Sequence, residues 1–160
     1  MSEDLVYGRQ PVREALRGRR AVREVLATAK AREALAWLDD APCPVRIADT
    51  GKIGNLARST DHQGLVARVD PYPYADPDEL LEGPAPLIVA LDGVTDPHNL
   101  GAILRSAVAL GADAVITLKD RAAPVTPVVV RASAGATEHA RVVRVVNLAR
   151  TLASLRDERG

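Results

Sequence analysis

The stretch LIVALDGVTDPHNLGAILRSAVALGADAVITL, residues 87–118, decides the fold class of this 160-residue chain. An apolar run ends in a polar loop, a helical pattern follows, and a second apolar run closes the unit. This order predicts a strand, a loop, a helix and a second strand within a parallel sheet. Because ligands in such sheets usually bind at the loop after a strand, we expect the functional site around Asp92–Asn99, with Arg105 in the following helix.

Within this stretch, the helix can be bounded from its own residues. Apolar side chains at helical spacing form a stripe from Leu100 to Val108. Asn99 is a candidate N-cap, and Gly111 stands where a helix commonly ends in a left-handed residue. The apolar run at 114–118 then predicts the second strand.

Beyond residue 118 the same alternation continues. Thr126-Pro127 is typical of a helix cap and first turn, although the three valines that follow are poor helix formers. The run at 141–146 predicts a third strand, and Asn147 is a candidate cap for a last helix. The order β-α-β-α-β-α predicts an α/β fold with a parallel sheet.

The N-terminal part predicts a separate small module. Its expected elements are a helix at 11–17, a strand at 21–27, a helix at 28–39, a strand at 43–49, a helix at 50–58 and a strand at 65–69. We therefore expect an α/β/α domain at 1–70, a semi-rigid linker rich in proline and acidic residues at 71–86, and a second domain at 87–160.

Composition excludes several protein classes. The 21 basic and 21 acidic residues cancel, so no overall field indicates a polyanionic partner. The absence of Phe predicts an aliphatic core, and no apolar run reaches the roughly 18 residues of a membrane span. The single cysteine, Cys43, excludes an internal disulfide. Since the N-terminus lacks the layout of a signal peptide, the expected location is cytoplasmic.

Charge is nevertheless uneven, because six arginines lie within fifteen positions and only Glu14 opposes them. These are Arg9, Arg13, Arg17, Arg19, Arg20 and Arg23. They are either a solvated surface or a set of phosphate contacts, for which the planar guanidinium is suited. No aromatic residues are interleaved, so any RNA contact would be to the backbone and its shape.

Three polar residues around the central helix could carry chemistry. Arg105 is flanked by small residues one turn away, which would allow a ligand, another chain or backbone to approach closely; it could equally be an ordinary surface arginine. Asn99 could be a helix cap, and Asp92 could belong to an ordinary Asp-Gly turn.

Other chemistries lack their motifs. His98 has no second ligand at metal-binding spacing, so no metal is expected. Neither a dinucleotide-binding nor a P-loop glycine pattern is present. An aspartyl nucleophile at Asp92 would want an acid two residues later, where Val94 stands.

Taken together, four segments resemble one family. LDGVTDPHNLGAILRSAVALGADAVI (91–116) resembles motif 1 of the SpoU (TrmH-type) RNA ribose 2′-O-methyltransferases of the SPOUT superfamily, through its D-P-x-N-x-G-x-x-x-R spacing. ASAGATEHARVVRVVNLARTL (132–152) also resembles that family. VYGRQPVREAL (6–16) and HQGLVARV (62–69) resemble its L30e-like RNA-binding domain, and the two-domain layout is most similar to the 23S rRNA guanosine 2′-O-methyltransferases.

The resemblance implies a cytoplasmic RNA methyltransferase that moves a methyl group from S-adenosylmethionine to a ribose 2′-hydroxyl without a metal. It places Asn99 and Arg105 in the catalytic site and Glu138 near it, and it assigns the arginine cluster to RNA binding. Because arginine stays protonated, we expect Arg105 to bind the target phosphate and stabilise the developing alkoxide. The expected substrate is 23S rRNA, with tRNA as the alternative, and the expected assembly is a homodimer.

The chain also departs from this family. Members continue well past the position of Gly160 into a G-x-E-G-x-G-like loop and an S-x-N-x-S-like segment, which form the knot, the donor pocket and much of the dimer interface. We therefore expect a fold without the knot, an unknown set of donor-binding residues and no activity from these 160 residues alone. The alternative is a non-catalytic RNA-binding module derived from such an enzyme.

Overall fold

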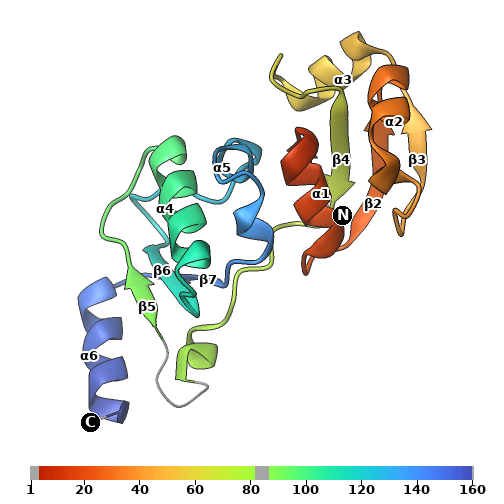
Figure 1. Cartoon of the computed structure of the whole chain (residues 1–160). Coiled ribbons are helices and arrows are strands. Elements are labelled where there is room, and N and C mark those ends of the chain that lie inside the picture. Colours follow the sequence, from red (N-terminus) through yellow and green to blue (C-terminus); the bar gives the residue numbers. More distant parts are fainter. Residues whose placement is uncertain (1–3, 82–86, 160) are drawn as a thin grey trace.

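The computed structural model describes residues 4–81 and 87–159, and its N-terminal part is a mixed sheet with helices (Figure 1). The strand order is β1-β4-β2-β3, in which β4 is antiparallel to β1 and β2, and β3 is parallel to β2. The strands are β1 (Asp4–Tyr7), β2 (Val22–Ala27), β3 (Val45–Ile47) and β4 (Leu65–Val69). The strands expected at 21–27, 43–49 and 65–69 are confirmed, and β1 is an additional strand.

The helices of this domain start at side-chain caps where the sequence offers one. They are α1 (Arg9–Arg17), α2 (Ala29–Ala34), the 3-10 turn η1 (Ala36–Leu38) and α3 (Thr50–Ala57). Thr28 accepts from the amide of Ala31 at the start of α2, as expected. The helix expected to run to residue 39 instead breaks at Leu35, because the next turn places Leu38 in the core.

The C-terminal domain is an α/β unit with a parallel sheet in the order β5-β6-β7. Its elements are β5 (Ile88–Ala90), α4 (Pro97–Ala109), β6 (Ala114–Leu118), α5 (Pro127–Ala132), the 3-10 turn η3 (Ala136–Glu138), β7 (Val142–Val145) and α6 (Leu148–Arg159). The caps at Thr126 and Asn147 are confirmed by bonds to the amides of Val129 and Arg150. The fold class predicted from the sequence is therefore confirmed.

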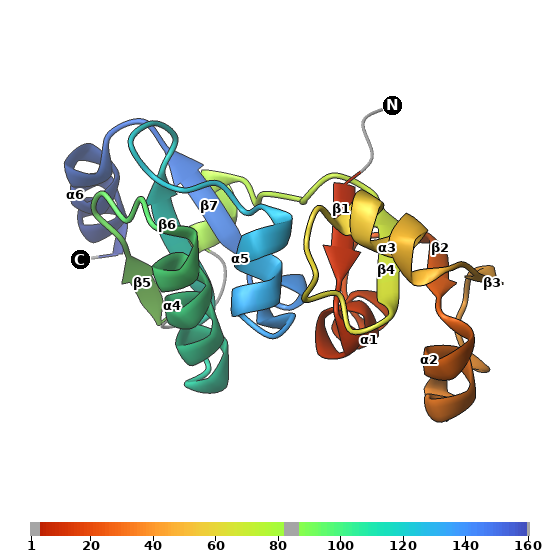
Figure 2. The same ribbon diagram turned by 90° about the horizontal axis from the view of Figure 1, so that it is seen from above.

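Alternating residues of the parallel sheet bury opposite faces. Val115 packs in the cluster that includes Leu100 and Val129 of α4 and α5, whereas Ile116 packs in the cluster that includes Leu155 of α6. Figure 2 shows α4 and α5 on one side of the sheet and α6 on the other. Both faces are covered, which explains the unbroken apolar run of β6.

The segment expected as a linker is packed in its first part. Tyr72 is buried, Ala75 bridges to Val143 beside β7, and a 3-10 turn, η2, follows at Pro77–Leu81. The last five residues of the expected linker, 82–86, lie outside the described residues. The domain boundaries themselves stay a prediction.

The two domains meet along a continuous seam. One core cluster runs from Val12 and Val6 of the N-terminal domain to Leu104 and Val130 of the C-terminal domain. The helix α1 packs against η3, and α5 packs against β1, so these elements face one another across the seam (Figures 1 and 2). In the part of the chain that the structure describes, no helix is long and apolar enough to cross a bilayer.

Candidate active site and nucleic-acid interface

The start of α4 frees Asn99 for another role. Asp96, not Asn99, is the N-cap, because its carboxylate accepts from the backbone amide of Asn99 at 2.8 Å. Pro97 fills the first helical position, where its missing N–H costs nothing. The prediction of Asn99 as N-cap is therefore wrong, and its side chain is exposed and not used for capping.

Asn99, Ala102 and Arg105 follow one another at intervals of three along α4 and so form a row on its surface. All three side chains are exposed. From Asn99 to Arg105 the helix rises about 9 Å, and the two positions lie about 120° apart around its axis, so the row is inclined to the axis. Among residues 4–81 and 87–159, neither Asn99 nor Arg105 has a side-chain hydrogen bond or ion pair.

Gly101, one turn before Arg105, serves helix packing. A Cβ at this position would lie 2.6 Å from the Cβ of Ala132 and 2.9 Å from the carbonyl oxygen of Val129. The small residue therefore lets the backbones of α4 and α5 approach closely. The sequence left open whether a ligand, another chain or backbone approaches the small residues near Arg105. At Gly101 the structure shows that the backbone of α5 does so.

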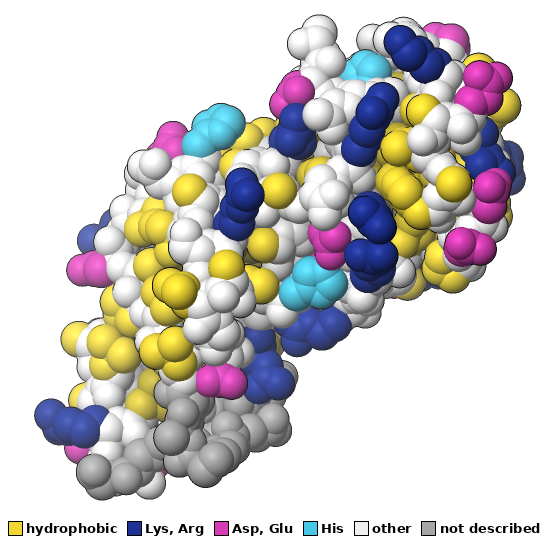
Figure 3. All heavy atoms as spheres, viewed as in Figure 1, with side chains coloured by type: hydrophobic (Ala, Val, Ile, Leu, Met, Phe, Trp, Pro, Cys, Tyr) yellow, Lys and Arg dark blue, Asp and Glu magenta, His cyan; other side chains and the backbone are white. Residues whose placement is uncertain are grey.

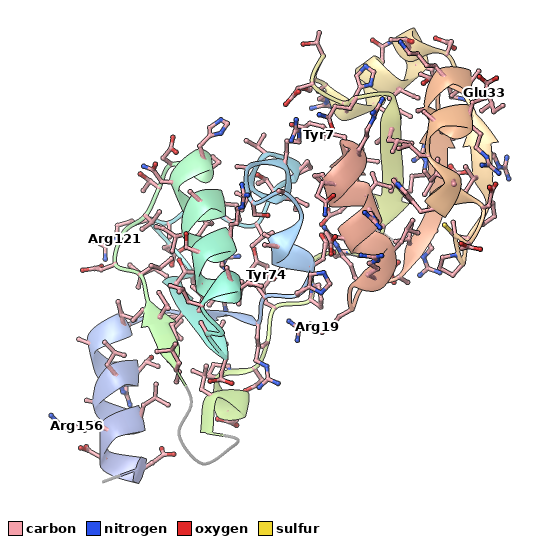
Figure 4. All side chains as sticks on the ribbon, viewed as in Figure 1. Tyr7, Arg19, Glu33, Tyr74, Arg121 and Arg156 are labelled. Carbon is pink, nitrogen blue, oxygen red and sulfur yellow. The ribbon has the colours of Figure 1, made fainter. Side chains whose placement is uncertain are left out.

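The carboxyl ends of the three parallel strands form a hollow of about 410 Å³. Asp92 follows β5 there, Arg121 lies in the loop after β6 (labelled in Figure 4), and Asn147 follows β7. Apolar walls come from Leu118 and Val146, and Val146 is 75% exposed. The described residues thus form an open hollow whose wall is partly polar and partly apolar.

Arg20 lies at the seam between the two domains. The residue is 7% exposed, and its guanidinium pairs with both carboxylate oxygens of Glu138, at 2.9 and 2.7 Å. A third contact runs to Asp4 at 3.6 Å. These contacts give Arg20 a structural role, and its assignment to RNA binding stays a prediction.

Glu138 lies at the same seam. It is 2% exposed, lies in η3 and pairs with Arg20 from the other domain. This pair holds the two domains in register. The placement of Glu138 near the catalytic site stays a prediction.

The remaining arginines of the cluster differ in the groups that they contact. Arg19 donates to the carbonyl of Ala140 at the seam (Figure 4), and Arg23 pairs with Asp70 at 2.7 Å. Arg17 lies 4.0 Å from Glu14, and the Nε of Arg13 is buried without a partner among the described residues. The side chain of Arg9 is exposed and has no partner in the same residues.

Tyr72 is a structural residue that the sequence analysis did not identify. Its hydroxyl lies 3.0 and 2.9 Å from the carbonyl oxygens of Thr137 and Ala140 and donates between them. Burial, reinforced by the nearby charge of Glu138, raises the pKa of this hydroxyl above its usual value. Two of the three tyrosines in the chain, Tyr72 and Tyr74, lie in this proline-rich segment. Their concentration there was the sequence signal that could have indicated a buried role.

Two further expectations concern reactive and metal sites. Cys43 is half-buried, and burial followed by the charge of Glu24 raises the pKa of its thiol, which disfavours the nucleophilic thiolate. Within the described ranges 4–81 and 87–159, no group of three or more potential ligands is placed to hold a metal ion. His98 is exposed at the start of α4.

Comparison with known proteins decides the family. The profile of the SpoU rRNA methylase family matches residues 86–160, and that of RNA 2′-O ribose methyltransferase substrate binding matches residues 5–75. A Staphylococcus aureus protein that carries the name of a TrmH family tRNA/rRNA methyltransferase is 39% identical over 168 residues, or 98% of this chain and 67% of the relative. The chain belongs to the SpoU (TrmH) RNA methyltransferase family.

Two further SpoU relatives define the extent of the likeness. The 23S rRNA (guanosine-2′-O-)-methyltransferase of Photobacterium profundum is 46% identical over 128 residues, covering 78% of this chain and 52% of that enzyme. The SpoU methyltransferase AviRb of Streptomyces viridochromogenes, solved with the cofactor AdoMet, superposes with a TM-score of 0.76 at 29% identity, covering 98% and 60% of the two chains. The chain thus spans about half to two thirds of the length of these relatives.

Proposed function

We propose that the full-length protein carrying this sequence transfers a methyl group from S-adenosylmethionine to a ribose 2′-hydroxyl of 23S rRNA. The observation that carries this proposal is the exposed row of Asn99, Ala102 and Arg105, whose polar groups have no protein partner among the described residues. Membership of the SpoU family and the name of the Photobacterium relative support the reaction and the substrate. A tRNA substrate is the alternative, since the name of the Staphylococcus relative includes both RNAs.

Arg105 would act as a binding and charge-stabilising group. A guanidinium has a pKa above about 12, so it does not remove a proton at neutral pH. Its several N–H groups can hold a phosphate of the target nucleotide and also face the 2′-oxygen as negative charge develops on it. Exposure on α4 leaves the guanidinium open to such an acceptor.

Asn99 would orient the acceptor. Because Asp96 already caps the helix, the Asn99 amide is free to donate to or accept from the ribose hydroxyl. A hydroxyl held in one direction reacts faster because less orientational freedom is lost at the transition state. The two residues thus divide the work into orientation and charge stabilisation.

The donor would supply an electrophilic methyl group on a sulfonium. The described residues do not by themselves fit it, because the hollow beside Asp92 and Asn147 is open and leaves Val146 75% exposed. We therefore assign no donor contact to these residues. We further propose that the 160 residues alone neither bind the donor tightly nor methylate RNA.

Isothermal titration of S-adenosylmethionine into the 160-residue chain tests this last point. The expected result is no measurable heat of binding at micromolar protein. Micromolar affinity would contradict it. If the gene encodes nothing beyond Gly160 and titration shows RNA binding without donor binding, the alternative of a non-catalytic RNA-binding module stands instead.

A homodimer is proposed for the full-length protein. Leu110 at the end of α4, Val146 and Leu152 of the α6 region are large apolar side chains that are 79%, 75% and 41% exposed. Covering such side chains is a common use of a subunit interface. Light scattering at known concentration should give twice the subunit mass, and a monomer would contradict the proposal.

The reaction itself is tested with tritiated S-adenosylmethionine and an unmodified 23S rRNA transcript. We expect label in the RNA at a position that resists alkaline hydrolysis, because a 2′-O-methyl group blocks cleavage at the neighbouring phosphodiester. Label on a base, or label in tRNA but not in rRNA, would overturn the reaction or the substrate respectively.

A further inference from the structure

Positive charge without a protein partner gathers at one end of the N-terminal domain and includes only Arg9 of the predicted arginine cluster. Within the described residues of the N-terminal domain, Arg9, Lys30, Lys52 and Arg58 have exposed side chains with no ion-pair partner. Arg20 and Arg23, by contrast, are paired with carboxylates. Figure 3 shows basic side chains and a histidine over the end of this domain that carries α3. Free cations, not paired ones, can bind a new anion without first breaking an ion pair.

Two adjoining hollows lie at this end of the domain. The first, of about 410 Å³, is lined by Arg9, Lys30 and the hydroxyls of Thr28 and Thr50. The second, of about 640 Å³, has Arg58 on its wall, and both share Thr50 and His62. No Asp or Glu is among the described residues that line either hollow, so the charged side chains of the lining are all basic, although the chain is neutral overall.

His62 presents a hydrogen-bond donor to both hollows. The residue is 7% exposed, and its Nδ1 accepts from the amide of Gly64 at 3.0 Å. A neutral ring that accepts at Nδ1 carries its hydrogen on Nε2. Across residues 4–81 and 87–159, no acceptor is bonded to this Nε2, and it is not among the buried polar atoms that lack a partner, so it faces the open space of the hollows. An acceptor of a ligand can therefore bind there without displacing a protein group.

The loop that carries His62 is fixed from the other domain. Arg131 of α5 pairs with Asp61 at 2.9 Å and also lies against Gly8 at the start of α1. Gly64 has a φ of +79°, and a Cβ there would lie 2.7 Å from the Thr28 hydroxyl. A side chain at Gly64 would therefore intrude on a polar lining residue of the first hollow.

We propose that the hollow lined by Arg9, Lys30 and His62 binds the phosphodiester backbone of the RNA substrate. This inference rests on the proposed function, since it names the surface with which the same RNA is held. The cations provide charge, His62 and the threonines provide donors, and a planar arginine can bind a phosphate bidentately. No Phe, Tyr or Trp is among the described residues that line the hollow, which favours backbone contact over base stacking.

The test compares two charge reversals in the whole 160-residue chain. Arg9→Glu with Lys30→Glu alters the hollow. Arg32→Glu with Arg46→Glu is the matched control on the same domain, because these two arginines lie outside both hollows and are paired with Asp39 and Glu24. Fluorescence anisotropy with a fluorescein-labelled fragment of 23S rRNA gives the Kd at several salt concentrations. A third variant, His62→Asn, keeps an acceptor for the Gly64 amide and removes the Nε2 donor.

We expect the hollow variant to weaken binding about 10- to 100-fold and to lower the salt slope by about 1.4, as for two lost contacts to a single strand. The control should change Kd less than about threefold, and His62→Asn should weaken binding severalfold at an unchanged slope. Equal effects of both reversals, or an unchanged Kd in the hollow variant, would overturn the inference alone. Absence of RNA binding by the unmodified chain would overturn the proposed RNA substrate as well.

Circular dichroism separates these outcomes from misfolding. Arg9 and Lys30 are exposed, so their reversal should leave the melting temperature nearly unchanged. If a variant does unfold, Arg9→Gln with Lys30→Gln removes the charge more gently, and an unchanged salt slope in that variant would equally overturn the inference.

Discussion

Arg20 and Arg105 mark two regions in which the same side chain meets opposite surroundings. At the seam between the domains, Arg20 is buried and held by Glu138 and Asp4. On the open face of α4, Arg105 is exposed and has no partner among the described residues. A paired, buried guanidinium is committed to holding the structure, whereas a free, exposed one is available to a substrate. The contrast teaches that arginine content alone does not locate a nucleic-acid surface.

The largest loss of stability is expected from a substitution of Glu138 at the seam between the domains. Glu138→Gln keeps the shape of the side chain but leaves Arg20 buried without its counter-charge, so we expect a loss of about 3–5 kcal/mol in the free energy of unfolding. Urea denaturation measures this loss. The control is Asp70→Asn, which breaks the half-exposed pair with Arg23 and should cost less than about 1 kcal/mol. Equal losses in the two variants would contradict the structural role given to Glu138.

The packing behind the α4 face is tested with matched helical glycines. Gly101→Ala places a Cβ 2.6 Å from that of Ala132, so it should destabilise by about 1–3 kcal/mol despite the better helix propensity of alanine. Gly54→Ala in α3 meets its nearest atom at 3.6 Å and should be neutral or stabilise by up to about 1 kcal/mol. Thermal melts compare both with the parent, and a stabilising Gly101→Ala would show that α4 and α5 are not in close contact.

At the start of α4, Asp96 caps the helix, whereas Asn99 is assigned to the chemistry. Asp96→Ala removes the N-cap and should cost about 1 kcal/mol of stability. Asn99→Ala should leave stability within about 0.5 kcal/mol, because its side chain has no partner in the described structure. Chemical denaturation of both variants tests this, and the reverse order would return Asn99 to a capping role.

The seam should also weaken in alkali through Tyr72. The raised pKa means that the folded state keeps the hydroxyl proton longer than the unfolded chain does, so the contribution to stability is full below about pH 10 and is lost as the pH rises past that value. Tyr72→Phe removes both the hydroxyl bond and this dependence. Urea midpoints of the parent and of Tyr72→Phe, measured from about pH 8 to about pH 11, should therefore converge. A difference that stays constant would contradict the role of the hydroxyl.

Local patterns predicted most of the fold. The β-α-β unit around α4, the caps at Thr28, Thr126 and Asn147, and the left-handed Gly111 all depend on near neighbours in the chain. The strand β1 was not predicted, and α2 ends early because tertiary packing of Leu38 overrides helix propensity.

Only part of the site was predicted. Some of its residues act on near neighbours in the chain, whereas others contact residues far away in the sequence. Asp96 and Asn99 stand three residues apart and are both good caps, so only coordinates could separate them. The pairing of Arg20 with Glu138 joins residues 118 positions apart, and no pattern within the sequence indicates it. The seam therefore had to be seen in the structure, whereas Arg105 could be singled out from its spacing.

Single-turnover methyl transfer by the full-length protein tests the central claim most directly. Arg105→Ala is compared with Arg150→Ala, an exposed arginine of α6 in the same domain. We predict that Arg105→Ala lowers the rate constant about 10²- to 10³-fold while the Kd for the donor and the melting temperature stay unchanged, and that Arg150→Ala has no effect on the rate. An Arg105→Ala variant that methylates RNA as fast as Arg150→Ala would contradict the assignment of this face to the acceptor.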